Sequence, residues 1–272
     1  YITRNSQDVV ERIRTRGYED GVNYPRFGGN DTIDVNSATA QPEENRGADI
    51  LIGGTGEDRV DGGWDESTDI ILGDNGVVVQ SDPMAGVNAD GSSFSNDIWT
   101  TDPTYGGKDI LSGGAGADII LGGTGYADAY GVGGDVIFGG TGNDHIAGDG
   151  ARVQRNAAGA IEIFESRDAL YGGDDRIDEE GVGRDGDSKG SDVILGGTGH
   201  DLINGGRTDD GAEIIFGDNG RVDYTQVRVV SVEQHLADEF YLTANVSSIE
   251  LDDDNTDVSF SGGADTIDGG YG

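Results

Sequence analysis

A nine-residue pattern, Gly-Gly-x-Gly-x-Asp-x-U-x with U a large apolar residue, limits what this chain can fold into more than any other feature. It occurs in full at residues 53–61, 113–121, 139–147 and 196–204. Glycines at its first, second and fourth positions permit the positive φ angles that tight turns require. Its last three residues suit a short strand whose central side chain faces inward, because strand residues alternate between faces. We therefore predict that two patterns form one coil of turn, strand, turn and strand, and that each pattern stacks on the next but one.

The pattern also brings oxygen atoms together. Successive turn carbonyls point at a common spot, and the sixth residue adds a carboxylate there. Calcium is a hard cation that prefers carbonyl and carboxylate oxygens, so we expect several Ca²⁺ ions between the stacked turns. The candidate ligands from the full patterns are Gly54, Gly56, Asp58, Gly114, Gly116, Asp118, Gly140, Gly142, Asp144, Gly197, Gly199 and Asp201. Partial patterns contribute Asp49, Asp69, Asp109, Asp135, Asp192 and Asp265.

Other acidic residues fit the pattern less well. Asp31 and Asp175 are equally well explained as solvated turn residues, and Glu213 stands where an aspartate is expected. Turns of the form Gly-Asp-(Asn)-Gly carry an aspartate at the second position, at Asp74, Asp149 and Asp218. These aspartates either cap a calcium site or form a local Asx turn that releases the chain from the coil, and we favour the Asx turn.

The composition is compatible with a fold because of these repeats. The formal net charge is −36, glycine accounts for 50 of the 272 residues, and large apolar residues are sparse. Such a chain would ordinarily stay disordered, since it buries too little apolar surface to offset conformational entropy. A solenoid needs only one inward apolar residue per strand, and divalent cations neutralise the carboxylates. The acidic charge argues against nucleic acid or an anionic membrane as a partner, no apolar run is long enough to span a bilayer, and the absence of cysteine excludes disulfides and thiolate metal sites.

The repeats run from residue 28 to residue 272 and are interrupted three times. We predict β-hairpin excursions from the side of the roll near 77–105, 151–170 and 221–260, with a hairpin turn at 156–159. Residues 1–27 are predicted to be an N-terminal cap or junction, or else a basic edge that docks on a neighbouring acidic molecule. Because residues 261–272 lie inside another repeat, we expect the chain to be a piece of a longer protein. The excursion aromatics either mediate assembly or fold back over the flank of the roll, and they are Phe94, Trp99, Phe164, Tyr224, Phe240 and Tyr241.

The sequence contains no catalytic constellation that stands out. Residues 186–190 fit G-x-S-x-G, but that hydrolase motif needs a strand before it and a helix after it, and the surrounding residues predict neither. His145 and His200 occupy variable positions of the nonapeptide, which usually face outward. We therefore do not expect this chain to be an enzyme.

The repeats resemble the RTX, or haemolysin-type calcium-binding, family, whose nonapeptide has this form. The resemblance covers residues 28–272 apart from the excursions, and it implies an all-β fold, a parallel β-roll (a right-handed β-solenoid), with Ca²⁺ bound by the aspartates and turn carbonyls. It also implies a large secreted bacterial protein that leaves the cell unfolded by type I secretion and folds outside on binding calcium.

Two functions are compatible with that resemblance. The first is a structural or adhesive module of a cell-surface protein, such as an adhesin, a surface-layer protein or a filament. The second is the calcium-dependent folding and secretion domain of an enzyme or toxin whose catalytic domain lies outside this chain. The long excursions favour the first. Its expected partners are calcium ions, with self-association or neighbouring surface proteins bound through the excursions, and neither nucleic acid nor insertion into a membrane.

Overall fold

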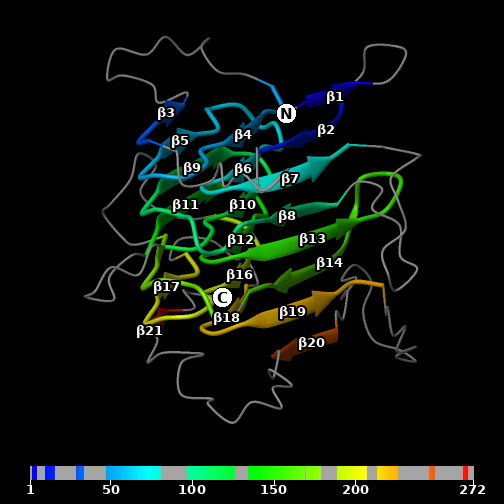
Figure 1. Cartoon of the computed structure of the whole chain (residues 1–272). Helices are drawn as coiled ribbons and strands as arrows, with labels where there is room; N and C mark the ends of the chain where they lie inside the picture. Colours follow the sequence, from blue (N-terminus) through cyan, green and yellow to red (C-terminus); the bar gives the residue numbers. More distant parts are fainter. Residues whose placement is uncertain are drawn as a thin grey trace, which may run out of the picture.

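The strands of this chain stack into three sheets (Figure 1). The computed structural model describes residues 2–4, 10–15, 29–33, 47–80, 97–125, 134–168, 170–178, 189–206, 213–225, 245–248 and 266–268. These residues form strands and turns without a helix, so they contain no helix that could cross a membrane. The predicted all-β fold is therefore confirmed.

Two of the sheets are parallel and together form the predicted roll. The inner parallel sheet, named for its middle place in the molecule, contains β4 (Ile50–Ile52), β6 (Ile70–Leu72), β10 (Ile119–Leu121), β12 (His145–Ala147), β16 (Val193–Leu195) and β18 (Ile214–Phe216). The outer parallel sheet contains β3 (Thr32–Ile33), β5 (Arg59–Asp61), β9 (Ile110–Ala115), β11 (Val136–Thr141), β15 (Arg176–Ile177), β17 (Leu202–Asn204) and β21 (Thr266–Asp268).

The chain alternates between these two sheets, which confirms the predicted stacking of each repeat on the next but one. Ile120 of β10 lies between Ile71 of β6 and Ile146 of β12, in parallel register. The central residue of each strand faces the space between the sheets, as the alternation of strand side chains requires. These residues form the core of the roll and are Leu51, Val60, Ile71, Leu111, Ile120, Ile137, Ile146, Ile177, Ile194 and Ile203.

The third sheet is antiparallel and contains the strands of the excursions. Its strands, in spatial order, are β1 (Ile2–Arg4), β2 (Val10–Arg14), β7 (Gly76–Val79), β8 (Ile98–Thr100), β13 (Ala151–Arg155), β14 (Ile161–Ser166), β19 (Gly220–Asp223) and β20 (Asn245–Ser248). The β13–β14 hairpin turns at 156–159 as predicted, with the Asn156 side chain accepting the amide of Ala158 at 2.9 Å.

The antiparallel sheet covers the inner parallel sheet, so the inner sheet is buried on both faces. All three residues of β6, β10 and β16 are buried, and their sequences are the continuous apolar runs Ile-Ile-Leu, Ile-Ile-Leu and Val-Ile-Leu. Leu72 and Leu121 point away from the roll core and pack with Val78, Val153 and Phe164 of the antiparallel sheet. The molecule therefore has a second apolar core outside the roll.

His145 lies in this second core rather than in solvent. Its ring contacts Phe164 edge-on at a centroid distance of 5.5 Å, and its Nε2 lies 3.0 Å from the Tyr224 hydroxyl. Burial lowers the pKa of His145 to about 4. The outward position predicted for this residue is correct with respect to the roll, but the side chain is covered by the next layer.

The excursions form antiparallel strand pairs as predicted, and these pairs join one another along the flank of the roll, which is the second of the two alternatives that the sequence left open. Phe164, one of the proposed assembly aromatics, is fully buried, and this corrects its proposed role at an interface. Phe94, Phe240 and Tyr241 lie outside the described residues. The N-terminal segment joins the same sheet, since Arg12 of β2 pairs with Val79 of β7, whereas the proposed boundary at residue 27 stays a prediction.

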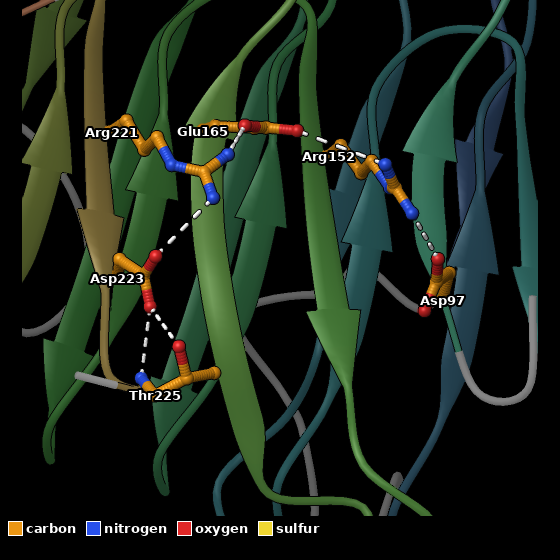
Figure 2. Close-up of polar contacts among 6 residues, drawn as sticks. All are labelled: Asp97, Arg152, Glu165, Arg221, Asp223 and Thr225. Atoms are coloured by element: carbon orange, nitrogen blue, oxygen red, sulfur yellow. Dashed lines mark hydrogen bonds and ion pairs between the residues drawn. The ribbon is translucent and has the colours of Figure 1, made fainter. Parts of the chain in front are cut away.

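A row of ion pairs crosses the antiparallel sheet from β8 to β19 (Figure 2). Arg152 binds Asp97 at 2.7 Å and approaches Glu165 at 3.9 Å, and Arg221 bridges Glu165 and Asp223. Asp97 is completely buried, and burial raises its pKa although the Arg152 guanidinium opposes this. Opposite charges on neighbouring strands stabilise such a pairing, so these side chains help to fix the order of the excursion strands.

The buried position of Phe164 predicts a large effect of its removal. Phe164→Ala should lower the free energy of unfolding of the calcium-loaded protein by about 3–5 kcal/mol, because it leaves a cavity between two sheets. Urea unfolding followed by circular dichroism measures the change. Leu170→Ala, a control at a side chain that is 66% exposed, should shift stability by less than about 0.5 kcal/mol. Unchanged stability of Phe164→Ala, combined with a smaller mass in light scattering, would instead assign Phe164 to an interface.

Candidate metal centres

The aspartates at the sixth position of the repeats form two ladders, one along each edge of the roll. In every step, Oδ1 of one aspartate accepts a hydrogen bond from the backbone amide of the aspartate one coil earlier, at 2.7–2.9 Å. The first ladder contains Asp31, Asp58, Asp109, Asp135, Asp175 and Asp201. The second ladder contains Asp49, Asp69, Asp118, Asp144 and Asp192.

The first glycine of each repeat forms a cradle in front of the aspartate. An ideal Cβ on Gly113 would lie 2.5 Å from Asp118 Oδ2 and 2.6 Å from the carbonyl oxygen of Gly139, one coil further on. An ideal Cβ would collide with the same two kinds of atom, a ladder Oδ2 and a carbonyl oxygen of the next coil, at Gly53, Gly62, Gly73, Gly122, Gly148 and Gly196. Each turn therefore directs at least two oxygens at a space that no side chain can enter.

The conformation of the glycines corrects one expectation from the sequence. The second and fourth positions have positive φ, for example 96° at Gly114 and 134° at Gly116, so glycine is required there for its backbone freedom. The first positions of the full repeats, such as Gly113, do not have positive φ. Glycine is needed at the first position because a side chain would displace the Asp118 carboxylate and the Gly139 carbonyl.

The second carboxylate oxygen of the ladders fits a cation. Oδ2 accepts no hydrogen bond from any described residue at Asp58, Asp109, Asp118, Asp135, Asp144 and Asp175, and all six side chains are buried. A buried carboxylate oxygen without a partner is costly unless a charge or donor compensates it. Nowhere in the described chain do three Asp, Glu, His or Cys side chains gather closely enough to hold a metal by themselves. A cation held here would therefore take much of its coordination from backbone carbonyls, as hard cations accept.

Burial perturbs the ladder carboxyls strongly in the metal-free protein. It raises the pKa of Asp144 to about 9, against the opposing hydrogen bond from the Asp118 amide. It likewise raises the pKa of Asp118 to about 7, and that of Asp109 to about 9, with repulsion from Asp135 as a second cause. A cation beside these groups would favour the charged form and oppose the effect of burial.

Two of these turns are split by an excursion. Gly73 lies before β7, yet the carboxylate that fills its cradle belongs to Asp109, after β8. Gly148 lies before β13, and its cradle is filled by Asp175, after β14. The excursion is thus inserted between the first and the sixth position of a single repeat, and its two ends meet again at the same turn.

Every aspartate predicted as a ligand, apart from Asp265, lies in one or other ladder. Asp31 and Asp175, which sequence reasoning left undecided, both belong to the first ladder. Glu213 directly precedes β18, in line with the ladder aspartates, and Asp265 lies outside the described residues. The first-position glycines were not predicted as part of a site. The sequence feature that could have identified them is the glycine at the start of every repeat, including the split ones.

The cradle geometry predicts the effect of adding a single methyl group. Gly113→Ala should weaken calcium-dependent folding severely, because its Cβ would collide with Asp118 Oδ2 and the Gly139 carbonyl. Gly29→Ala is the matched control, since its Cβ would meet nothing within 4 Å. The calcium midpoint of folding in circular dichroism measures both. A midpoint that moves equally in the two variants would mean that the cradle has no special role.

The raised pKa values predict opposite pH dependences with and without calcium. A carboxyl with a folded pKa near 9, such as Asp144 or Asp109, binds a proton in the fold that the unfolded chain does not bind until about pH 4. The metal-free fold should therefore gain stability as pH falls from about 9 toward 5. Calcium must displace the same protons, so the calcium midpoint should rise over that range. Thermal melts in EDTA and calcium titrations at pH 5 and pH 8 measure the two trends. Metal-free melts that weaken on acidification would contradict this assignment.

Comparison with known proteins agrees with this geometry. The family model of the RTX calcium-binding nonapeptide repeat matches four segments, residues 45–77, 104–126, 130–151 and 187–221. No characterised protein and no solved structure gives a significant match. The segments contain the ladder aspartates from Asp49 to Asp144, and the gaps between them contain β8, β14 and most of β13, from the antiparallel sheet. This chain therefore contains RTX calcium-binding nonapeptide repeats, which bind several Ca²⁺ ions, and these repeats form its parallel β-roll.

Proposed function

We propose that this chain is a calcium-folded structural module of a large secreted bacterial surface protein, of an adhesive, surface-layer or filament-like kind. RTX repeats are typical of secreted bacterial proteins. Outside the cell calcium is abundant, so a chain secreted unfolded meets its ligand only after export. The calcium-binding repeats are established for this chain, and its place in a surface protein is the proposal.

The two aspartate ladders support this proposal more than any other feature. They bury carboxylates in single file along both edges of the roll, with hydrogen-bonded Oδ1 and, for most, an Oδ2 directed at a carbonyl-lined cradle. We propose these aspartates as the calcium ligands, together with the turn carbonyls of the second and fourth glycines. Without cations such a file of charges is unfavourable, so metal-binding free energy becomes folding free energy.

The antiparallel sheet favours a structural role over a simple folding tail for an enzyme. It adds a second apolar core, around Phe164 and Val153, to a roll that already has its own. We propose that residues 28–272 fold as one calcium-dependent unit that residues 1–27 join through β2. The ladder aspartates are used in the turns of the roll, and we propose no catalytic role for them.

Self-association through the excursions remains a proposal, now limited to the outer face of the antiparallel sheet. Phe164 faces inward, whereas Trp99 follows Ile98, which packs inward, and so points to the opposite face. Trp99 is half-buried. A surface partner would therefore contact this face together with the ion-pair row of Figure 2.

Removal of calcium tests the proposed function directly. EDTA should abolish the cooperative thermal melt and the β signal in circular dichroism, and millimolar CaCl₂ should restore both. Asp144→Asn should raise the calcium midpoint about tenfold or more, whereas Glu57→Gln, an exposed control, should not. A metal-free chain that melts at the same temperature as the calcium-loaded chain would exclude a calcium-folded module.

Mechanical measurement separates a structural module from a folding tail. In single-molecule pulling on the chain, calcium should raise the unfolding force along the whole roll, as a module of a surface protein requires. A low unfolding force in saturating calcium would favour the folding domain of a secreted enzyme or toxin instead.

A further inference from the structure

Two of the turns where the chain leaves the roll contain a buried aspartate, Asp74 or Asp149, whose side chain bonds to a distant segment. Oδ2 of Asp74 accepts the backbone amide of Thr124, on the next coil, at 2.7 Å. Asp149 accepts the amides of Gly173 and Thr198, which also lie far along the chain. The Asx turn favoured from the sequence is therefore wrong for both residues, because their side chains bridge coils instead of capping their own turn.

Both aspartates lie where the two ends of an excursion meet again. The returning segments at 102–109 and 168–175 share the sequence Asp-x-x-Tyr-Gly-Gly-x-Asp. The first Asp of each, Asp102 or Asp168, has positive φ, and its carbonyl accepts the amide of the following Tyr at 2.9 and 2.8 Å. The same returning turn therefore closes both excursions, and its last residue is the ladder aspartate Asp109 or Asp175.

We call the place where the two ends of an excursion meet its corner. Gly106 and Gly172, in the returning segments, give each corner a cradle like that of the intact repeats. An ideal Cβ on Gly106 would collide with Asp74 Oδ2 and with the carbonyl oxygen of Thr124. An ideal Cβ on Gly172 would collide with the Asp149 carboxylate. On the opposite side of each turn, the cradles of Gly73 and Gly148 hold Asp109 and Asp175.

The carboxylate oxygens of this corner are buried and incompletely satisfied. Asp74 is 2% exposed and Asp109 is 0% exposed. Oδ1 of Asp74 and Oδ2 of Asp109 accept no hydrogen bond within the described part of the chain. Asp175 Oδ2, beside Asp149, is buried in the same way. Neighbouring buried carboxylates repel one another unless a positive charge lies between them.

We propose that Asp74 with Asp109, and Asp149 with Asp175, each complete a divalent cation site at the base of an excursion. This inference rests on the proposed calcium-dependent folding and adds to it a second kind of site. The four full repeats have glycine at the second position, whereas these split turns have an aspartate there, so each corner carries one more carboxylate. The ion joins the departing and returning strands and holds the antiparallel sheet against the roll.

The extra carboxylate predicts that the corner sites fill before the others, since calcium affinity rises with ligand charge. Calcium titration of the full chain, by competition with a chromophoric chelator, should show two ions bound more tightly than the rest. Asp74→Asn and Asp149→Asn each keep an oxygen for the Thr124 or Thr198 amide but remove the charge. Each should weaken one tight site about 10- to 100-fold, and the double variant should lose both.

Asp168→Asn is the matched control. It removes an exposed carboxylate from the same returning turn, and asparagine tolerates its positive φ of 56°. Its calcium binding should equal that of the wild type. Two tight ions retained in the double variant would overturn the corner sites while leaving the ladders in place, whereas a wild-type chain that binds no calcium would overturn the proposed function as well.

A second measurement keeps the test decisive if an aspartate variant does not fold. Tyr105 and Tyr171 directly precede Gly106 and Gly172, so they should sensitise Tb³⁺ bound at the corners. The variant Tyr105→Phe with Tyr171→Phe should reduce tyrosine-sensitised emission from the first two equivalents of Tb³⁺ by at least half. Unchanged emission from these equivalents would contradict binding at the corners.

Discussion

The burial of carboxylates in successive turns is the constraint on which the rest of this structure depends. Apart from the first aspartate of each ladder, Oδ1 of every ladder aspartate is fixed by the amide of the previous coil, as Asp144 is by Asp118, so these carboxylates cannot turn toward solvent without breaking the stacking of the turns. The other oxygen is left facing carbonyls. The charged form of such an arrangement needs a cation, because charge buried in a medium of low dielectric must be paired. In the proposed calcium-folded module, the metal is therefore part of the fold and completes the turns between which the strands pack.

The antiparallel sheet shows how a thin solenoid gains stability beyond its own core. The roll offers one inward residue per strand, such as Ile120, and a narrow core of this kind buries little area per coil. Covering the inner sheet turns the outward side of the same strands into a second core, where Leu72 and Leu121 meet Phe164. The β7–β8 and β13–β14 excursions each add two strands to this layer without disturbing the repeat that they interrupt, because each leaves and returns within one turn.

Continuity of the ladders across the interruptions follows from that insertion point. Asp109 is separated from Gly73 by β7 and β8, yet it fills the Gly73 cradle as Asp118 fills that of Gly113. The hydrogen bonds from backbone amides to Oδ1 continue through Asp109 and Asp175, and they have the same lengths there as in the rest of the ladder. A solenoid therefore tolerates long insertions where the first and sixth positions of a turn can still meet, since each coil needs only its neighbours.

The sequence by itself determined the parallel roll, the stacking of alternate repeats and most ladder aspartates. These features are local, because glycine, aspartate and an apolar residue at fixed positions within nine residues specify the turn, the ligand and the inward side chain. Sequence reasoning gave the wrong reason for the first glycine, since the collision at Gly113 involves a carbonyl of another coil.

Only the tertiary structure decided that the excursions merge into one sheet, that Phe164 is buried, and that Asp74 reaches Thr124. The runs Ile-Ile-Leu in β6 and β10 indicate that the inner sheet is covered on both faces, since a strand with apolar residues on both sides is buried on both. What covers them could not be read from the sequence. Pairing among distant strands depends on the register of whole coils, and no local pattern encodes that register.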